Sequence, residues 1–221
     1  MYDNHPSPEE YDARIRSTIP RYDALLADAL DVAVHSGVEV KYWVDVGAGT
    51  GNMAIMAMAR FPKAKFTLLD ISSDMLSIAK SKAGEERTVY VHGSSDRMKI
   101  ADQTADVVTC IQSNHYSEEE GHAKVLEECH RILRPGGILI VSENVASRTE
   151  KGYEIARSRL KTYLTEKGRT DNDAEGFLDR YGTDYHPHTV EQHIKLLEDA
   201  GFRDVEVFYY NFGQVGLFGF R

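Results

Sequence analysis

Apolar runs alternate with helical patterns along this 221-residue chain from residue 41 onward. A short apolar run favours a buried strand, and apolar positions three and four residues apart favour a helix with one buried face. The patterns predict strands at 41–46, 65–70, 88–92, 106–112 and 137–142, and helices at 52–60, 73–82 and 117–133. Strands separated by helices of this length are typical of a parallel sheet with helices on both faces.

The last part of the chain departs from this alternation. A helix predicted at 189–200 stops before Gly201, and glycine commonly follows the last residue of a helix. Two further apolar runs, 204–210 and 214–220, are joined by residues 211–213, which indicates an antiparallel hairpin that closes the sheet. The expected fold is therefore α/β and Rossmann-like, with a seven-stranded, mostly parallel sheet ending in a C-terminal antiparallel hairpin.

Two segments lie outside the alternating core. Pro20 breaks residues 8–35 into two predicted helices, so residues 1–38 are expected to form an N-terminal helical cover. Residues 144–188 form a long, aromatic and charged insert, which is expected to be a mostly helical lid. Segments of this length in a compact domain are usually functional. The length of the whole chain, 1–221, favours a single domain.

The charge balance disfavours nucleic acid as a partner. Lysine and arginine number 26 against 35 aspartates and glutamates, which gives a net charge of −9 without a dense basic run. Proteins that bind nucleic acid usually carry a basic stripe, because contacts with phosphate dominate their affinity. No apolar run approaches the ~18 residues of a membrane helix. Cys110 and Cys129 are too few for a disulfide framework, so we expect a cytoplasmic protein. The oligomeric state stays open, with a homodimer as one option.

A glycine-rich loop follows the first predicted strand. Residues 47–51, Gly-Ala-Gly-Thr-Gly, stand where the strand turns into a helix. Glycine lets the backbone approach a ligand closely, because it has no Cβ and accepts positive φ. Asp70 ends the second strand 19 residues after Gly51, where a carboxylate can bind both hydroxyls of a ribose. Asp45, two residues before Gly47, would repel a pyrophosphate but suits an ammonium group. The loop therefore favours a nucleoside with an amino-acid moiety over a dinucleotide.

These motifs resemble those of class I S-adenosylmethionine-dependent methyltransferases. Residues 44–51 resemble the first motif of that family, and residues 68–72 resemble the second, with Asp70 in the ribose position. Residues 133–141 are similar to the turn before strand five and to the strand itself. The resemblance covers about residues 40–143. It implies an enzyme that uses S-adenosylmethionine to methylate a small-molecule nucleophile.

The resemblance implies a set of cofactor-binding residues along the carboxyl edge of the sheet. In the family an acidic residue after strand three contacts adenine, but Ser94 stands at that position here, followed by Ser95 and Asp96. Any of these three residues can bind the adenine amine, and the choice stays open. The full expected set is Tyr22, Asp45, Gly47, Ala48, Gly49, Asp70, Ile71, Ser94, Ser95, Asp96, Ile111 and Gln112.

A narrower resemblance extends over most of the chain. Residues 19–22, 142–143, 200–202 and 211–213 look like the branch that contains carboxy-S-adenosylmethionine synthase. This likeness implies that Tyr22 contacts the cofactor and that Arg180, after a two-residue gap, holds a carboxylate.

The chain departs from that branch at two places. The synthase has cysteine and serine in its glycine loop and an asparagine near the end of strand four. Here the loop is that of an ordinary methyltransferase, and residues 110–112 are Cys-Ile-Gln. Ordinary methyl transfer is therefore the main hypothesis. The alternatives are a synthase-like enzyme and a catalytically inactive regulatory protein that binds the cofactor.

Candidate chemistry follows the fourth predicted strand. Methyl transfer needs alignment of the reactants, and it needs a base only when the nucleophile arrives protonated. His115 is a candidate base, although it can equally cap or pack under the next helix. Tyr116 and Arg180 are candidate substrate-binding residues; the alternative for Arg180 is a surface ion pair with Asp179 or Asp184.

The lid insert leaves two further interpretations. His186 and His188 are two residues apart on a loop, which is not the i, i+4 spacing of strong metal motifs, so no metal is expected. The aromatic residues of the insert can line a substrate pocket or form the core of the insert itself. They are Tyr153, Tyr163, Phe177, Tyr181 and Tyr185.

Overall fold

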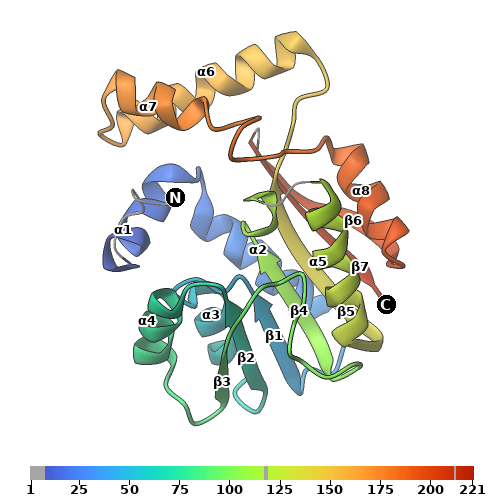
Figure 1. Ribbon diagram of the computed structural model, residues 1–221. Helices are drawn as coiled ribbons and strands as arrows, with labels where there is room; N and C mark the ends of the chain where they lie inside the picture. Colours follow the sequence, from blue (N-terminus) through green and yellow to red (C-terminus); the bar gives the residue numbers. More distant parts are fainter. Residues whose placement is uncertain (1–7, 117–118, 212) are drawn as a thin grey trace.

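The computed structural model describes residues 8–116, 119–211 and 213–221 (Figure 1). In this part of the chain seven strands form one sheet, in the order β3-β2-β1-β4-β5-β7-β6. The strands are β1 (Tyr42–Val46), β2 (Lys65–Asp70), β3 (Thr88–His92), β4 (Ala105–Ile111), β5 (Leu133–Asn144), β6 (Arg203–Asn211) and β7 (Gln214–Phe220). The helices are α1 (Pro8–Thr18), α2 (Tyr22–His35), α3 (Asn52–Arg60), α4 (Ser73–Ala83), α5 (Glu119–Ile132), α6 (Glu150–Glu166), α7 (Asp171–Leu178) and α8 (Val190–Asp199).

The order of the strands confirms the predicted fold. Strand β1 pairs in parallel with β2 on one side and with β4 on the other. Strand β7 is antiparallel to both β5 and β6, which is the predicted C-terminal hairpin. The order of strands reverses between β1 and β4, and ligands of open α/β sheets bind beyond the carboxyl ends of the strands at such a point.

Two apolar layers cover the two faces of the sheet. Trp43 belongs to the layer shared with α2, α3 and α4, whereas its neighbour Val44 belongs to the layer shared with α5 and α8. Both side chains are fully buried, because successive residues of a strand point to opposite faces. Burial on both faces explains why the parallel strands appear in the sequence as continuous apolar runs.

The start of strand β5 differs from the prediction. The sequence predicts a strand at 137–142, but β5 spans Leu133–Asn144. Leu133 pairs with Ala105, and the regular register resumes at Ile138 opposite Val107. The residues between them, including Gly136 with φ of 80°, bridge a register shift. The turn signal of proline and glycine is therefore present as an irregularity within the strand.

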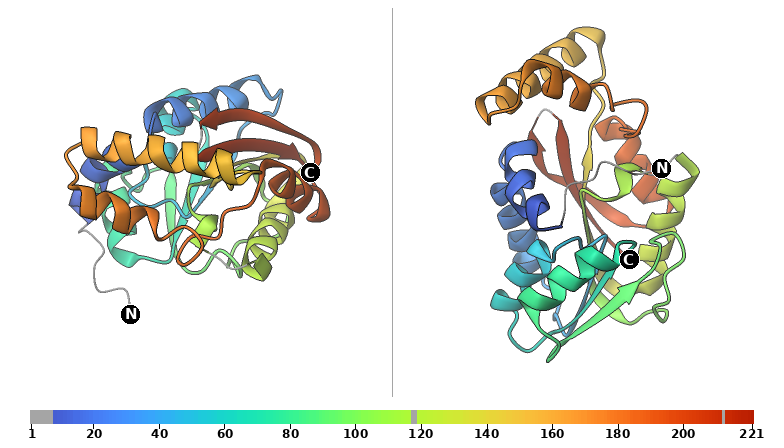
Figure 2. Two further views of the ribbon diagram at one scale, coloured as in Figure 1. Left: turned by 90° about the horizontal axis from the view of Figure 1, so that it is seen from above. Right: turned by 60° about the vertical axis from the view of Figure 1, so that its left-hand side comes forward.

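The N-terminal cover and the lid insert meet beyond the carboxyl ends of the parallel strands. Helices α6 and α7 run side by side across this edge, and α1 lies between them and the sheet (Figures 1 and 2). The hydroxyl of Tyr163 donates a 2.6 Å hydrogen bond to the carbonyl of Arg16. Arg169 donates a 2.6 Å bond to the hydroxyl of Thr18. These bonds join α1 to the insert, so two segments far apart in the sequence enclose one region.

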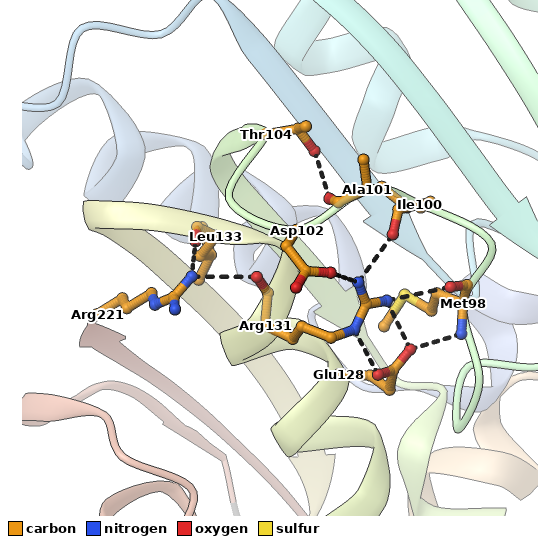
Figure 3. A network of polar contacts seen from close by, with 9 residues as sticks. All are labelled: Met98, Ile100, Ala101, Asp102, Thr104, Glu128, Arg131, Leu133 and Arg221. Atoms are coloured by element: carbon orange, nitrogen blue, oxygen red, sulfur yellow. Dashed lines mark hydrogen bonds and ion pairs between the residues drawn. The ribbon is translucent and has the colours of Figure 1, made fainter.

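An arginine on α5 fixes the long connection between β3 and β4 (Figure 3). Arg131 donates to Glu128, at 2.7 Å from Nε, and to the carbonyl of Ile100 at 2.9 Å, and it also binds Asp102. Glu128 accepts a 2.7 Å bond from the amide of Met98. Arg131 and Glu128 therefore tie the connection that contains residues 94–96 to the body of the domain.

Candidate active site

The glycine loop has the backbone that its sequence predicts. Gly47, Gly49 and Gly51 all have positive φ, of 64°, 53° and 81°. A Cβ added to Gly47 would overlap the side chain of Ser113, so that position is closed by protein atoms. A Cβ added to Gly49 would meet nothing within 4 Å. The space beside Gly49 is open, as the approach of a ligand requires.

Asp70 lies beside this open position. Its Oδ2 accepts a 2.7 Å hydrogen bond from the amide of Gly49, and its Oδ1 accepts a 2.8 Å bond from the amide of Ser72. These bonds fix the carboxylate at the end of β2 and join it to the glycine loop. A carboxylate oxygen accepts more than one hydrogen bond, so capacity remains for the hydroxyls of a ribose.

Asp45 lies at the reversal of strand order with its side chain in the protein interior. The residue is 2% exposed, and Oδ1 accepts a 2.7 Å bond from the hydroxyl of Thr109. Oδ2 has no hydrogen-bond partner among the described residues. Burial raises the pKa of Asp45 to about 7. The hydrogen bond from Thr109 acts against this rise, and the charge of Asp70 adds to it. A cationic group of a ligand would satisfy this carboxyl.

Apolar and polar groups expected near adenine lie at the ends of β2, β3 and β4. Ile71 is 73% exposed, which is unusual for a large apolar residue directly after a buried strand. Ser94 and Ser95 are half-buried and Asp96 is exposed, all in the loop after β3. Ile111 ends β4 half-buried. An exposed isoleucine beside polar loops suits the face of a planar base.

Gln112 turns the chain sharply after β4. Its φ is 54°, its amide nitrogen donates to the carbonyl of Ser142 at 2.8 Å, and its side-chain nitrogen donates to the Ser142 hydroxyl at 2.9 Å. A left-handed backbone at a residue other than glycine is uncommon and is held here by β5. The turn directs the chain into the short helix that carries His115.

Helix α1 contacts the end of the glycine loop through Asp12, a residue that the sequence does not single out. Asp12 accepts a hydrogen bond from the hydroxyl of Thr50, one of 2.9 Å from Asn52, and one of 2.7 Å from the amine of Lys82. Although burial raises the pKa of Asp12, these hydrogen bonds outweigh it and lower the value. Asp12 therefore fastens the N-terminal cover to the start of α3.

Tyr22 lies on the loop side of the cover. It begins α2 and is 9% exposed, and burial raises the pKa of its hydroxyl to about 12. The hydrogen bond from Asn52 and the charge of Asp45 also act on this hydroxyl, which shows that both are close by. The predicted cofactor residues Tyr22, Asp45 and Asp70 thus gather around the glycine loop.

His115 pairs with an acidic residue inside the protein. Its Nδ1 lies 3.5 Å from Oε2 of Glu143, and the two residues are 4% and 2% exposed. Burial, followed by the charge of Arg180, lowers the pKa of His115 to about 3. Burial raises the pKa of Glu143 to about 8. Burial therefore disfavours the charged form of both residues.

A cavity of about 670 Å³, here called the lid cavity, lies between α1, the lid insert and the carboxyl edge of the sheet. The sheet side of the lid cavity is formed by Gln112, His115, Asn144 and Gln214, and the side of α1 by Arg14, Ile15, Ser17, Thr18 and Ile19. The lid side includes Lys167, Arg169, Asp173, Phe177, Arg180, Tyr181 and Tyr185. Three lid aromatics line the cavity and also pack on one another, with Phe177 and Tyr181 each within 6.0 Å of Tyr185, measured between ring centroids.

The structure brings some expected residues together and separates others. Arg180 lines the lid cavity and also forms a 2.8 Å ion pair with Asp184, so both interpretations of this arginine describe part of its surroundings. Tyr22 is not among the residues that line that cavity. The side chain of Tyr116 lies outside the described residues. Among the described residues no cluster of three or more histidine, cysteine, aspartate or glutamate residues could hold a metal ion.

Sequence reasoning missed several residues of the site. Glu143 lies near the end of the buried strand β5, where a charged residue is a usable signal, but its contact with His115 depends on how two strand ends meet. Asp12 and Arg169 carry no local signal, because their roles arise from the packing of the cover and the insert.

No helix in the described part of the chain has the length and apolarity to cross a membrane.

The sheet order, the glycine loop and the fixed Asp70 define a Rossmann-like nucleoside-binding protein. Residues 44–137 match the family model described as a methyltransferase domain. The chain is 31% identical to the mitochondrial 2-methoxy-6-polyprenyl-1,4-benzoquinol methylase of Caenorhabditis elegans, over 87% of this chain and 73% of that protein. The chain belongs to the S-adenosylmethionine-dependent methyltransferases, and S-adenosylmethionine is its cofactor.

Two further comparisons cover nearly the whole chain. The carboxy-S-adenosyl-L-methionine synthase of Wolinella succinogenes is 27% identical over 90% of this chain and 84% of its own length. Human N-acetylserotonin methyltransferase, solved in complex with SAM, is 20% identical with a TM-score of 0.61. That match covers 97% of this chain and 53% of the human chain, and it shows the shared fold.

Proposed function

We propose that this enzyme methylates a small molecule bound in the lid cavity, next to a cofactor held by the glycine loop. The observation that carries the proposal is the position of the cavity, which reaches the sheet at Gln112 and His115, directly after β4. A cavity of about 670 Å³ lies within the range of small-molecule sites. The net charge of −9 favours such an acceptor over nucleic acid. Two free, buried cysteines suit a reducing compartment, and we propose the cytoplasm.

The residues around the glycine loop fit the cofactor. The open space at Gly49, the fixed carboxylate of Asp70 and the unsatisfied Oδ2 of Asp45 suit backbone approach, a ribose and an ammonium group. Ile71 offers an apolar surface for the base, with Ser94, Ser95 or Asp96 as partners for its amine. When bound, S-adenosylmethionine supplies a methyl group on a positively charged sulfur, which a nucleophile displaces in line.

His115 and Glu143 are proposed to remove the proton of a hydroxyl or ammonium acceptor. His115 is neutral near pH 7 and can receive a proton from an acceptor in the lid cavity. Its low pKa makes the imidazolium form unstable unless Glu143, 3.5 Å away, is ionised. Glu143 therefore stabilises the protonated histidine only in the fraction of molecules in which it has lost its own proton.

Two measurements test the proposed function. Calorimetric titration with S-adenosylhomocysteine reports cofactor binding, and a screen of hydroxyl, amine, thiol and carbon nucleophiles with S-adenosylmethionine reports turnover. Binding together with methylation of at least one acceptor is expected. Absence of cofactor binding by the folded protein would overturn the proposal, and binding without turnover over a broad panel would favour a regulatory protein.

A synthase-like activity is the second candidate. It is favoured by Arg180, which lines the lid cavity, and by the 90% of this chain that aligns with a carboxy-S-adenosyl-L-methionine synthase. Mass spectrometry of the ligand that remains bound through purification separates the two functions. S-adenosylmethionine or S-adenosylhomocysteine supports methyl transfer, and a carboxylated cofactor supports the second candidate.

A further inference from the structure

The lid cavity is lined by more positive than negative groups, although the whole chain is acidic. Arg14, Lys167, Arg169 and Arg180 line it, against one carboxylate, Asp173. The net charge of the chain is −9, so the composition of the protein does not explain this excess. Charges gathered around a cavity concentrate their potential in it, which favours a ligand of the opposite sign.

Three of these four cations have no carboxylate within ion-pair distance in the described part of the chain. Only Arg180 is paired, with Asp184 at 2.8 Å, whereas Arg14, Lys167 and Arg169 form no such pair. Asp173 instead accepts a 2.7 Å bond from the hydroxyl of Thr170 at the start of α7. Other cations of the described chain, such as Arg203, also lack an ion pair, so the distinctive feature here is that several unpaired cations line one cavity.

Arg169 has the surroundings of a ligand-binding arginine. Its Nη2 donates 2.6 Å to the hydroxyl of Thr18, and its guanidinium lies 4.8 Å from the centroid of the Phe177 ring. These contacts hold the planar group in one orientation while leaving other N–H groups available. Burial, followed by the charge of Arg14, lowers the pKa of Arg169, and the charge of Asp173 opposes this shift without cancelling it. A guanidinium that is fixed in advance binds a carboxylate or phosphate with two parallel hydrogen bonds.

The opposite wall of the cavity offers a hydrogen-bond acceptor. Gln214 is 2% exposed and lines the cavity, and its Oε1 has no partner among the described residues. A buried carbonyl oxygen without a partner destabilises the protein, and a hydrogen-bond donor on a ligand would remove that penalty. The cavity thus presents cations on the side of α1 and the lid, and a free acceptor on the side of the sheet.

We propose that the acceptor substrate is an acidic small molecule whose carboxylate or phosphate binds Arg169 and Arg14, while an N–H or O–H group binds Gln214. This inference rests on the proposed function, because it names the class of molecule that fills the lid cavity. Carboxylate and phosphate share the required charge and geometry, so the experiment distinguishes them.

The test compares anions with neutral molecules of nearly equal shape. The carboxylate pair is 4-hydroxybenzoate and 4-hydroxybenzamide, and the phosphate pair is 4-hydroxyphenyl phosphate and its neutral dimethyl ester. Each probe is titrated calorimetrically into the full-length protein, with and without saturating S-adenosylhomocysteine. In at least one pair the anion is expected to bind at least tenfold more tightly, and the pair with the larger preference identifies the anionic group.

Variants assign the preference to the cavity. Arg169→Gln and Arg14→Gln are each expected to reduce the tenfold preference to threefold or less, whereas Arg169→Lys keeps part of it. Arg203→Gln is the matched control, because Arg203 is an exposed arginine on β6 that does not line the cavity. Arg14→Gln covers the case in which Arg169→Gln disturbs the lid, which a lowered Tm would reveal.

The outcomes separate this inference from the proposed function. Equal binding of anion and neutral partner in both pairs overturns the inference, as does full retention of the preference in both glutamine variants. If S-adenosylhomocysteine binds in such a case, the proposed function still stands. If an anion is preferred while S-adenosylhomocysteine fails to bind, the anion site stands and the proposed function falls.

Discussion

The hydroxyl of Thr109 on β4 donates a 2.7 Å hydrogen bond to Oδ1 of Asp45 on β1, across the point where the strand order reverses. The indole nitrogen of Trp43 donates in turn to the Thr109 hydroxyl at 2.9 Å. One oxygen of a buried carboxyl is therefore held by the protein, while the other has no partner in the described structure. This arrangement leaves one carboxyl oxygen available to a ligand, and it lowers the stability of the protein when no ligand is bound.

The first prediction follows from the raised pKa of Asp45, which is about 7. A carboxyl whose pKa is raised on folding contributes stability that is fully present below its unfolded value and is lost as pH rises through the folded value. Asp45→Asn does not ionise, so the protein without cofactor should gain stability relative to wild type between pH 6 and 8.5. Because about one pH unit separates pH 6 from the folded pKa, this gain over wild type should grow by about 1.4 kcal/mol between pH 6 and 8.5.

Denaturant titrations at several pH values measure the stability difference, and calorimetry measures the effect of the substitution on cofactor binding. The same substitution should weaken binding of S-adenosylhomocysteine, because the ammonium group loses its carboxylate. A variant that is destabilised equally at pH 6 and 8.5 would show that burial does not control the ionisation of Asp45.

The second prediction concerns Asp70. Asp70→Ala removes a carboxylate that holds the amides of Gly49 and Ser72 and is proposed to bind the ribose. Hydrogen bonds to charged groups contribute about 1.5–3 kcal/mol each, so affinity for S-adenosylhomocysteine should fall at least tenfold. Asp74→Ala, at an exposed position on α4, is the matched control and should bind normally. Unchanged calorimetric affinity of folded Asp70→Ala would remove this residue from the site.

The third prediction separates two glycines of one loop. A Cβ at Gly47 would overlap Ser113, whereas a Cβ at Gly49 would project into open space. Both positions have positive φ, so either substitution carries backbone strain of about 1–2 kcal/mol. Gly47→Ala should therefore lower Tm more than Gly49→Ala, and Ser113→Gly should recover part of the loss. Gly49→Val should mainly abolish cofactor binding.

A double-mutant cycle on Gly47 and Ser113 provides the check for this prediction. If the two changes add without coupling, the overlap is relieved by a movement of the loop, and the glycine is needed for its φ alone.

The fourth prediction is a pH profile of turnover. If ionised Glu143 stabilises the positive charge that forms on His115, activity should rise as Glu143 loses its proton, with a midpoint near pH 8. Glu143→Gln cannot ionise, so it should lose this rise and keep the lower activity across the range. His115→Gln should lower turnover by ~100-fold or more for a protonated acceptor while cofactor affinity is retained.

An acceptor that reacts without losing a proton gives the control for the fourth prediction. Its methylation should not depend on Glu143. An identical pH profile for wild type and Glu143→Gln with a hydroxyl acceptor would assign the pair a structural role.

The sequence predicts the elements of the sheet because each buried strand carries its own apolar signal. The glycine loop and Asp70 are equally local, since a backbone with positive φ and a carboxylate at a strand end follow from few residues. The pair of His115 and Glu143 is different, because its two members are 28 positions apart and meet only through the pairing of β4 with β5. Arg169 is the extreme case, because its partner Thr18 lies 151 positions away on another segment. The sequence therefore predicts the conformation of the glycine loop and single residues of the lid cavity, such as His115 and Arg180, but not the contacts that join the cover to the insert.

The bonds from Asp12 to Thr50, Asn52 and Lys82 have a consequence for the order of events in a catalytic cycle. Helix α1 is fastened to the loop that frames the cofactor site, and the lid insert rests in turn on α1. If the cofactor lies beneath α1, exchange of the acceptor breaks only the contacts of Tyr163 and Arg169 with α1, whereas exchange of the cofactor also breaks those of Asp12. The expected kinetic scheme is compulsory, with the cofactor entering first and its product leaving last. Product inhibition by S-adenosylhomocysteine should then be competitive against S-adenosylmethionine and noncompetitive against the acceptor.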